Sequence, residues 1–365
     1  MNRLQRLHDA GVSIWLDTLS RELLESGAFA ALVGEFAVTG ATSNPTIFAK
    51  AITGSDRYDA QLRTLAPGAG DDLQELFFAV ALEDVRRAAQ VLLPVHRRTG
   101  GDDGYVSFEC TPDVADDAEA TIAQALHLWQ RLDLPNVLIK VPATQAGVSA
   151  IEALTARGVN INVTLLFSVE RYEEVIEAYL RGLEHRIAAG DPIDEITSVA
   201  SFFVSRIDTK ADAMLAPDSP ARGRVAIANA HRAYGRYLAR FSDERWRRLQ
   251  QHGARPQRPL WASTGTKDPS YSDVLYVERL ISPGVINTMP ENTLRAFADH
   301  GNIGEPLGSD VSAANAVLAD AAAEGVDLET FTRELEREGV TSFCDSYAQL
   351  LGRIASRVGS LIPTP

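Results

Sequence analysis

The chain has 365 residues, of which 45% are hydrophobic and 23% are charged, a composition that is typical of a globular protein and excludes a disordered one. The formal net charge of −14 repels nucleic acid and anionic membranes, so we expect neither as a partner. A phosphorylated substrate would be repelled as well, so a site for one needs local positive charge of its own.

The ends and the cysteines indicate the compartment. The first residues, MNRLQRLHDAG, contain no apolar segment followed by a cleavage site, and no apolar run approaches the roughly 20 residues that span a bilayer. Cys110 and Cys344 have no Cys or His partner at a metal-binding spacing, and the histidines show no such pairing either. We therefore expect a cytoplasmic protein with two reduced thiols, no metal and no other cofactor.

Short apolar runs alternate along the chain with longer amphipathic stretches. Strands that alternate with helices predict parallel βαβ units, and eight of them suggest a closed barrel, although counting alone leaves a doubly wound sheet open. The runs span residues 12–17, 37–44, 104–110, 136–142, 159–167, 196–204, 258–263 and 284–290. The predicted helices span residues 19–33, 73–96, 115–132, 169–188, 222–249 and 290–299.

The alternation of side chains along the runs favours the barrel. In the fifth run, Ile161, Val163 and Leu165 form an aliphatic face that we assign to the outside, whereas Asn162 and Thr164 lie on the opposite face. A doubly wound sheet is covered by helices on both sides and favours aliphatic residues on both faces. We therefore predict an α/β fold of the (β/α)8 TIM barrel class, with polar residues gathered at the carboxyl ends of the strands.

The remaining segments predict extra helices rather than a second domain. We expect one domain over residues 1–365, with the barrel core at about 12–300. The stretch 205–252 is longer than one barrel unit needs and predicts an inserted helix. Residues 310–323 and 327–356 predict two C-terminal helices, and the last of these either covers the mouth of the barrel or forms an interface.

Lysine is rare in this sequence. Only four of the 35 basic residues are lysines, namely Lys50, Lys140, Lys210 and Lys267. Lys140 lies on the inward face of an apolar run, where an ammonium without a partner tends to lose its proton and become a nucleophile that forms Schiff bases with carbonyls. A lone lysine at a strand end more often extends to solvent, so its neighbours must decide between the two interpretations.

Those neighbours suit aldol chemistry. Asp17 and Glu109 lie at the ends of the first and third runs, Asn44 follows the second, and Asn162 and Thr164 lie on the fifth. Cleavage of a carbon–carbon bond next to an iminium needs one carboxylate at the reacting hydroxyl and a second acid/base at the imine carbon. The alternative is that these residues form a hydrogen-bonded polar layer inside the barrel. Because five of them lie on matching strand ends, this alternative is the weaker interpretation.

Seven motifs resemble, in order, the strand-end motifs of the transaldolase family. The match runs from about residue 12 to about residue 290, and the length and the WASTGTK form are similar to the longer bacterial-type members. The motifs are WLDTLS (15–20), TSNPT (42–46), FEC (108–110), LIKVPAT (138–144), INVTLLFS (161–168), SFFVSRID (201–208) and WASTGTKDP (261–269).

The resemblance implies a role for each catalytic residue. Lys140 would form the Schiff base, and Asp17 would be the acid/base at the hydroxyl next to the cleaved bond. Glu109 would relay protons at the imine carbon, with a water held near Thr164.

The resemblance also implies the residues that bind substrate. Asn44 and Asn162 would bind hydroxyls of the dihydroxyacetone unit, Ser201 would line the site, and Phe203 would close it with an apolar surface. Arg206 would bind the substrate phosphate, as the fork of its guanidinium suits. Many transaldolases carry a second phosphate-binding arginine after the seventh strand, whereas this chain has Ser263 and, four residues later, Lys267, which we expect to supply that charge.

The function implied is the transfer of a dihydroxyacetone unit from sedoheptulose 7-phosphate to glyceraldehyde 3-phosphate, giving erythrose 4-phosphate and fructose 6-phosphate, in the non-oxidative pentose phosphate pathway. Sugar phosphates are then the partners, and the enzyme is a monomer or a homodimer. The nearest alternative is fructose 6-phosphate aldolase, a lyase that tends to have Gln at the position of Glu109 and Tyr at that of Phe203. A catalytically silent barrel that binds sugar phosphates is a third possibility, which the presence of Lys140 and both carboxylates disfavours.

Overall fold

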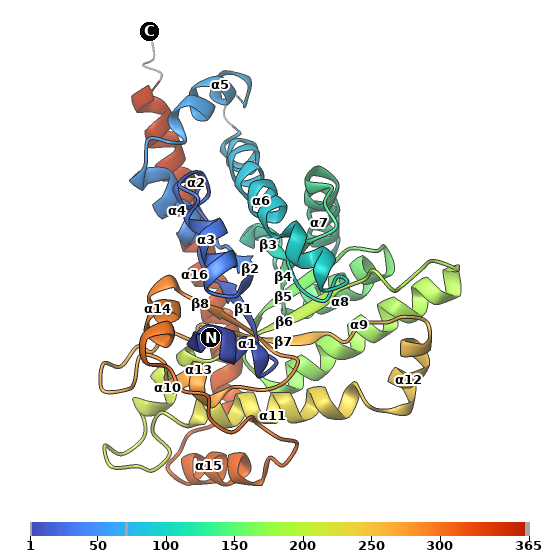
Figure 1. Ribbon diagram of the computed structural model, residues 1–365, viewed down its shortest axis with the longest axis vertical. Helices are drawn as coiled ribbons and strands as arrows, with labels where there is room; N and C mark the ends of the chain where they lie inside the picture. The colour runs from blue at the N-terminus through green and yellow to red at the C-terminus, as the bar shows by residue number, and fades with distance from the viewer. Residues whose placement is uncertain (1, 70–71, 362–365) are drawn as a thin grey trace.

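The structure is a computed structural model that describes residues 2–69 and 72–361, and its centre is a closed barrel of parallel strands (Figure 1). Each strand pairs with the next, and the first pairs with the last to close the ring. The predicted (β/α)8 barrel is thereby confirmed. The strands are β1 (Ser13–Leu16), β2 (Val38–Thr42), β3 (Val106–Glu109), β4 (Val137–Pro142), β5 (Ile161–Leu166), β6 (Ser198–Phe203), β7 (Arg258–Ala262) and β8 (Ile286–Met289).

Helices surround the barrel (Figure 1). Those of the first half are α1 (Arg3–Asp9), α2 (Arg21–Glu25), α3 (Ala28–Glu35), α4 (Pro45–Gly54), α5 (Asp59–Ala69), α6 (Leu73–Arg98), the 3-10 turn η1 (Pro112–Val114), α7 (Ala118–Leu132) and α8 (Gln145–Ala156). Those of the second half are α9 (Val169–Ala189), α10 (Ser205–Asp212), α11 (Val225–Arg240), α12 (Glu244–Gln251), α13 (Leu275–Arg279), α14 (Glu291–His300), α15 (Ser312–Ala323) and α16 (Leu328–Leu361). Among the described residues, no helix is both long and apolar enough to cross a membrane.

Two predicted helices are interrupted in the structure. The predicted helix 19–33 is split into α2 and α3 at Gly27, whose positive φ of 77° ends one helix and begins the next. The predicted helix 222–249 is likewise split into α11 and α12, because the side chain of Asp243 accepts a hydrogen bond from the backbone N–H of Trp246 and starts a new helix. Helices α1, α4, α5, α8 and α13 were not predicted individually.

The predicted alternation of strand faces holds with one exception. Trp15, Tyr105 and Leu138 point into the barrel and pack with one another. The residues that alternate with them along each strand face the helices. Leu165 was assigned to the outer face, and that assignment is wrong. Its φ is +58° and the register of β5 with β6 shifts between Val163 and Leu166, so the side chain turns from the helix layer toward the mouth of the barrel.

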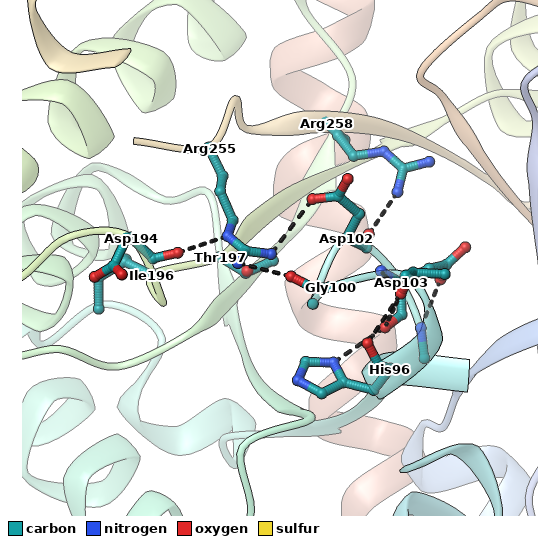
Figure 2. Close-up of polar contacts among 12 residues, drawn as sticks. His96, Gly100, Asp102, Asp103, Asp194, Ile196, Thr197, Arg255 and Arg258 are labelled. Atoms are coloured by element: carbon teal, nitrogen blue, oxygen red, sulfur yellow. Dashed lines mark hydrogen bonds and ion pairs between the residues drawn. The ribbon is translucent and has the colours of Figure 1, made fainter. Parts of the chain in front are cut away.

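The N-terminal end of the barrel is closed by arginine contacts. Figure 2 shows Arg255 between the backbone of Asp194 and the loop that carries Gly100 and Asp102, and its guanidinium donates to all three at 2.7 to 3.3 Å. Arg258 donates to the Asp102 carbonyl at 2.8 Å. These contacts tie β7 to the loop before β3 at the amino ends of the strands. The catalytic residues of TIM barrels lie at the opposite, carboxyl ends.

A buried ion pair fixes the loop that follows β1. The Arg21 guanidinium donates to Asp84 on α6 at 2.9 Å, and Tyr58 donates to the other carboxylate oxygen at 2.9 Å. The Tyr58 hydroxyl also accepts the backbone N–H of Arg21 at 2.8 Å. Arg21 and Asp84 are 4% and 0% exposed, so the pair is shielded from solvent.

We expect Asp84→Ala to lower the free energy of unfolding by about 3–5 kcal/mol, because it leaves the Arg21 guanidinium buried without its counter-ion. Chemical denaturation measures this change. Its neighbour Glu83 pairs with Arg87 on the half-exposed face of the same helix, so Glu83→Ala is the matched control and should cost no more than about 1 kcal/mol. Equal losses in the two variants would contradict a special contribution from the buried pair.

Candidate active site

A cavity of about 700 Å³ opens at the carboxyl ends of the strands. Its size is that of a small-molecule site, and its position is that of the catalytic end of a TIM barrel. Most of the residues predicted from the sequence line it, namely Asp17, Asn44, Glu109, Lys140, Thr164, Ser201, Phe203, Arg206, Ser263 and Lys267.

Lys140 points into the cavity from β4, directly beside Glu109 of β3. The two residues are register partners on neighbouring strands, and the Lys140 amine forms an ion pair with Glu109 Oε1. The amine also donates to the Ser43 carbonyl at 3.1 Å, and the residue is only 7% exposed. Burial raises the pKa of the Glu109 carboxyl and the charge of Lys140 opposes that rise. A carboxyl in this setting can take a proton from the amine and return it.

The second oxygen of Glu109 is uncommitted. Oε2 is buried and has no hydrogen-bond partner among the described residues. A buried carboxylate oxygen is normally paired, so this one is placed to bind a group that enters the cavity, such as a substrate hydroxyl or a water.

Asp17 approaches the same cavity from the end of β1. Its carboxylate accepts a hydrogen bond from Thr42 at 2.7 Å, and Thr42 lies 2.8 Å from the hydroxyl of Thr288 on β8. Burial raises the pKa of Asp17, and the nearby Lys140 opposes this rise. The cavity therefore brings the Lys140 amine together with two carboxyls whose pKa values are raised, the set that general acid–base catalysis at a Schiff base needs.

Asn162 is the one predicted site residue that does not line the cavity. It is completely buried, donates to Ser107 Oγ at 2.9 Å and accepts from Ser201 Oγ at 2.7 Å. Its hydrogen bond therefore fixes the side chain of Ser201, which does line the cavity. Ser107 was not predicted as a site residue, although its place on the inward face of β3 was available as a signal.

Asn44 and Thr164 take different positions at the wall. The Asn44 side chain caps α4 by accepting the backbone N–H of Ile47 at 3.0 Å, so the residue that begins this helix also borders the cavity. Thr164 is 2% exposed and lies on β5 opposite Pro142 of β4 in the register. Its hydroxyl is thus on the strand next to Lys140.

The wall formed by β6 and β7 is the basic side of the cavity. The Arg206 guanidinium lies over the Phe203 ring at 5.2 Å, and burial lowers its pKa. Ser263 has a φ of +57° and its hydroxyl lies 2.9 Å from that of Ser205, which joins the two strand ends. Lys267 is exposed at the rim. Among the described residues, no carboxylate lies within 4.0 Å of the cationic group of Arg206 or of Lys267.

Helix α16 lies over the mouth of the barrel, because its residues line the cavity, and Figure 1 shows this long red helix beside α4. Ser342, Phe343 and Ser346 line the cavity from above, and a Cβ built on Gly339 would lie 3.1 Å from Leu165. The first of the two alternatives for this helix, that it covers the mouth, is therefore correct. The individual lining residues were not predicted, because the amphipathic pattern does not reveal which element a helix will face.

A protein-family model described as Transaldolase/Fructose-6-phosphate aldolase matches residues 14–354 of this chain. The chain belongs to this family. Proteins named transaldolase from Frankia alni and Thermobifida fusca are 49% and 48% identical to it, each over 98% of both chains. A transaldolase of Mycobacterium bovis is 47% identical over 95% of both chains. The transaldolase family that the sequence motifs predicted is thus confirmed.

Asp208 is a further buried carboxyl and lies close in sequence to Arg206 of the basic wall. Asp208 on α10, two residues after Arg206, accepts hydrogen bonds from the Ala226 backbone N–H at 2.7 Å and from Tyr276 at 2.9 Å. Burial raises its pKa from 3.8 to about 7, against the effect of these hydrogen bonds. The folded protein therefore holds this proton at pH values at which the unfolded chain has released it.

We expect the contribution of Asp208 to stability to fall as the pH rises from about 4 to 7 and to stay constant above that window, with a total change of up to about 4 kcal/mol. Asp208→Asn removes the titration, so the variant should gain stability relative to the native protein between pH 5 and pH 8. Denaturant unfolding at both pH values measures the difference. A difference that does not depend on pH would contradict the raised pKa.

Proposed function

We propose that this enzyme is a transaldolase that moves a dihydroxyacetone unit from sedoheptulose 7-phosphate to glyceraldehyde 3-phosphate, giving erythrose 4-phosphate and fructose 6-phosphate. The observation that carries the proposal is the buried Lys140 amine in contact with Glu109, in one cavity with Asp17. The relatives named transaldolase support it. On this proposal the enzyme acts in the non-oxidative pentose phosphate pathway of the cytoplasm, as a monomer or a homodimer of single-domain chains.

The first half of the reaction is formation of the Schiff base. Lys140, after passing a proton to Glu109, attacks the C2 carbonyl of the ketose and forms a carbinolamine. Glu109 returns the proton to the C2 hydroxyl, which leaves as water, and an iminium remains. The free Oε2 of Glu109 is the oxygen that holds this water, with Thr164 on the neighbouring strand beside it.

The second half breaks and remakes one carbon–carbon bond. Asp17 takes the proton of the C4 hydroxyl, the electrons of the C3–C4 bond move to the iminium, and the aldehyde departs from the resulting enamine. The enamine carbon then attacks the carbonyl of the acceptor aldehyde, and Asp17 returns its proton to the new hydroxyl. Hydrolysis of the iminium releases the new ketose and restores Lys140.

The remaining residues hold the sugar and limit side reactions. Asn44 and Ser201 bind hydroxyls of the dihydroxyacetone unit, and Asn162 keeps Ser201 in position through the 2.7 Å hydrogen bond. Phe203 shields the enamine from water. Arg206, with the Ser263 region and Lys267, binds the phosphate, because a charged cavity wall concentrates anions even in an acidic protein.

We expect Lys267→Ala to raise the KM for fructose 6-phosphate about tenfold, with a smaller effect on kcat, because the lysine binds a phosphate that is remote from the breaking bond. Steady-state kinetics of the transfer reaction measure both constants. The exposed Arg248 on α12 pairs with Glu244 and lies outside the cavity lining, so Arg248→Ala controls for the loss of one positive charge. A KM equal to that of the control would mean that Lys267 is a solvated loop residue that does not bind the phosphate.

The test of the function itself compares transfer with release. The enzyme is supplied with fructose 6-phosphate, with and without erythrose 4-phosphate, and both free dihydroxyacetone and sedoheptulose 7-phosphate are measured. We expect rapid transfer and very slow release. Release without an acceptor at a comparable rate would identify the lyase, fructose 6-phosphate aldolase, and binding without either product would identify a silent barrel. Glu109 and Phe203, which replace the Gln and Tyr typical of such aldolases, favour transfer.

A further inference from the structure

Helix α10 carries one residue of the phosphate-binding wall and two acidic residues that the proposed reaction does not use. Arg206 lies in its first turn and lines the cavity, whereas Asp208 and Asp212 lie one turn apart further along the helix and do not line it. Asp208 is 1% exposed. A buried carboxyl needs hydrogen-bond partners, and the partners show which parts of the protein it joins.

Asp208 joins α10 to two other segments. One of its oxygens accepts the backbone N–H of Ala226 at the start of α11 at 2.7 Å, and the other accepts a hydrogen bond from Tyr276, in the segment that follows β7, at 2.9 Å. Tyr276 is as deeply buried as Asp208, so bulk solvent cannot replace either partner. The pair therefore fixes the middle of α10 against both segments.

Asp212 repeats this arrangement one turn later. One oxygen accepts the backbone N–H of Gly223, just before α11, at 3.0 Å, and the other accepts a hydrogen bond from Tyr271 at 2.8 Å. Gly223 has a φ of +64°, and a Cβ built on it would lie 2.8 Å from the Tyr271 ring, so a glycine is needed for the ring to come this close. The end of α10 is thus held by the same two segments as its middle.

The segment that supplies both tyrosines also carries Lys267. A hydrogen-bonded turn connects this lysine to the first tyrosine, since the Tyr271 N–H donates to the Asp268 carbonyl at 3.2 Å. Where the segment leaves β7, the Ser263 hydroxyl lies 2.9 Å from that of Ser205, the first residue of α10. Contacts at the start, middle and end of α10 therefore hold it against the segment that carries Lys267.

The two cations of the wall need such support. Arg206 and Lys267 belong to different elements, and in the described part of the chain neither has a carboxylate within 4.0 Å to hold it. Like charges repel each other until an anion binds to both. A phosphate binds most tightly when the spacing of the cations already fits it, because no free energy is then lost in ordering them.

We propose that Asp208 with Tyr276, and Asp212 with Tyr271, are positioning residues that hold Arg206 and Lys267 at the spacing that binds a phosphate. The inference rests on the proposed function, which assigns the substrate phosphate to this wall. Loss of one tyrosine hydroxyl lets α10 and the segment after β7 move relative to each other, and ordering them again on binding costs part of the affinity.

The test is equilibrium binding of glycerol 3-phosphate, measured by titration calorimetry on the native enzyme and on three tyrosine variants. This ligand has a phosphate ester but no carbonyl, so it reports on the wall without Schiff-base chemistry. We expect Tyr271→Phe and Tyr276→Phe each to weaken binding about fivefold, the equivalent of one hydrogen bond. Tyr179→Phe is the matched control and should bind as tightly as the native enzyme, because the buried Tyr179 donates to the Arg255 carbonyl at 2.8 Å near the amino ends of the strands.

Steady-state kinetics with fructose 6-phosphate, at saturating acceptor, separate positioning from a general loss of structure. Displaced phosphate-binding residues raise KM and leave kcat nearly unchanged, whereas a partly unfolded preparation lowers kcat and leaves KM unchanged. We expect Tyr271→Phe and Tyr276→Phe to show the first pattern, with a KM about fivefold above that of the native enzyme.

Three results would overturn the positioning role: an unchanged affinity for glycerol 3-phosphate in either variant of the wall, an equal loss in Tyr179→Phe, or a lowered kcat at unchanged KM. The binding measurement does not depend on transfer. An enzyme that fails to transfer, but binds glycerol 3-phosphate in a way that depends on Tyr271 and Tyr276, would refute the proposed reaction and keep this role. Normal transfer with unchanged phosphate affinity in the variants would do the reverse.

Discussion

Lys140→Ala will reduce the transfer rate by at least about 10⁴-fold, since the variant lacks the only group that the proposed reaction joins covalently to the substrate. Borohydride added with fructose 6-phosphate should label the native enzyme at Lys140 and leave the variant unlabelled, which mass spectrometry of the digested protein can show. The fold should persist. Without the positive charge of Lys140, burial raises the pKa of Glu109 unopposed, and the carboxyl becomes neutral instead of remaining as a buried charge.

Two further variants secure this result. Lys140→Met keeps most of the side-chain volume, so loss of activity in both Lys140 variants, together with native circular dichroism, separates chemistry from unfolding. Lys210 is the matched lysine outside the cavity, and Lys210→Met should keep both activity and the label at Lys140. A labelled residue other than Lys140, or an active Lys140→Met enzyme, would refute the assigned Schiff base.

Asp17→Asn will slow the cleavage of the carbon–carbon bond by about 10²–10⁴-fold and leave the Schiff base able to form. The amide of the variant can still accept the hydrogen bond from Thr42, so the geometry at the end of β1 is kept while the base is lost. The expected signature is an enzyme that borohydride and fructose 6-phosphate still label at Lys140, although transfer to erythrose 4-phosphate is nearly absent. Rapid-quench measurement of the first turnover separates the two steps.

Glu109→Gln provides the opposite pattern and so serves as the control for Asp17. Its carboxyl contacts the Lys140 amine, and we expect its loss to slow labelling itself, because proton transfer at the imine carbon becomes rate-limiting. Equal behaviour of the two variants would show that the carboxyls do not have separate roles. Normal cleavage in Asp17→Asn would remove that residue from the mechanism.

The catalytic face of each strand was predictable from the sequence, because successive side chains of a strand alternate between its two sides. The inward assignment of Lys140, of Glu109 and of Asp17 needed no more than this rule together with the motifs, and the cavity lining agrees with it. The rule failed at Leu165, where a positive φ and a shift of register break the alternation. A single residue in a left-handed conformation leaves no mark in a hydrophobic pattern.

The contacts over the mouth depend on the tertiary structure. Thr46 and Ser346 are 300 residues apart in the chain and yet hydrogen-bonded, and Arg21 meets Asp84 across 63 residues. Residues 327–356 were predicted as a helix that covers the mouth or forms an interface, but a sequence pattern gives only the direction that a side chain takes around its own helix.

Sequence alone determined the barrel, its order of strands and the polar residues at their ends, because these follow from local alternation and from the rule that neighbouring βαβ units pair. Tertiary structure alone decided that Asn162 lies beneath Ser201 instead of in the cavity wall and that Lys50 faces the cavity from α4. Both placements depend on how elements far apart in the chain pack against each other, and packing is settled by the shapes of all the contacting surfaces at once.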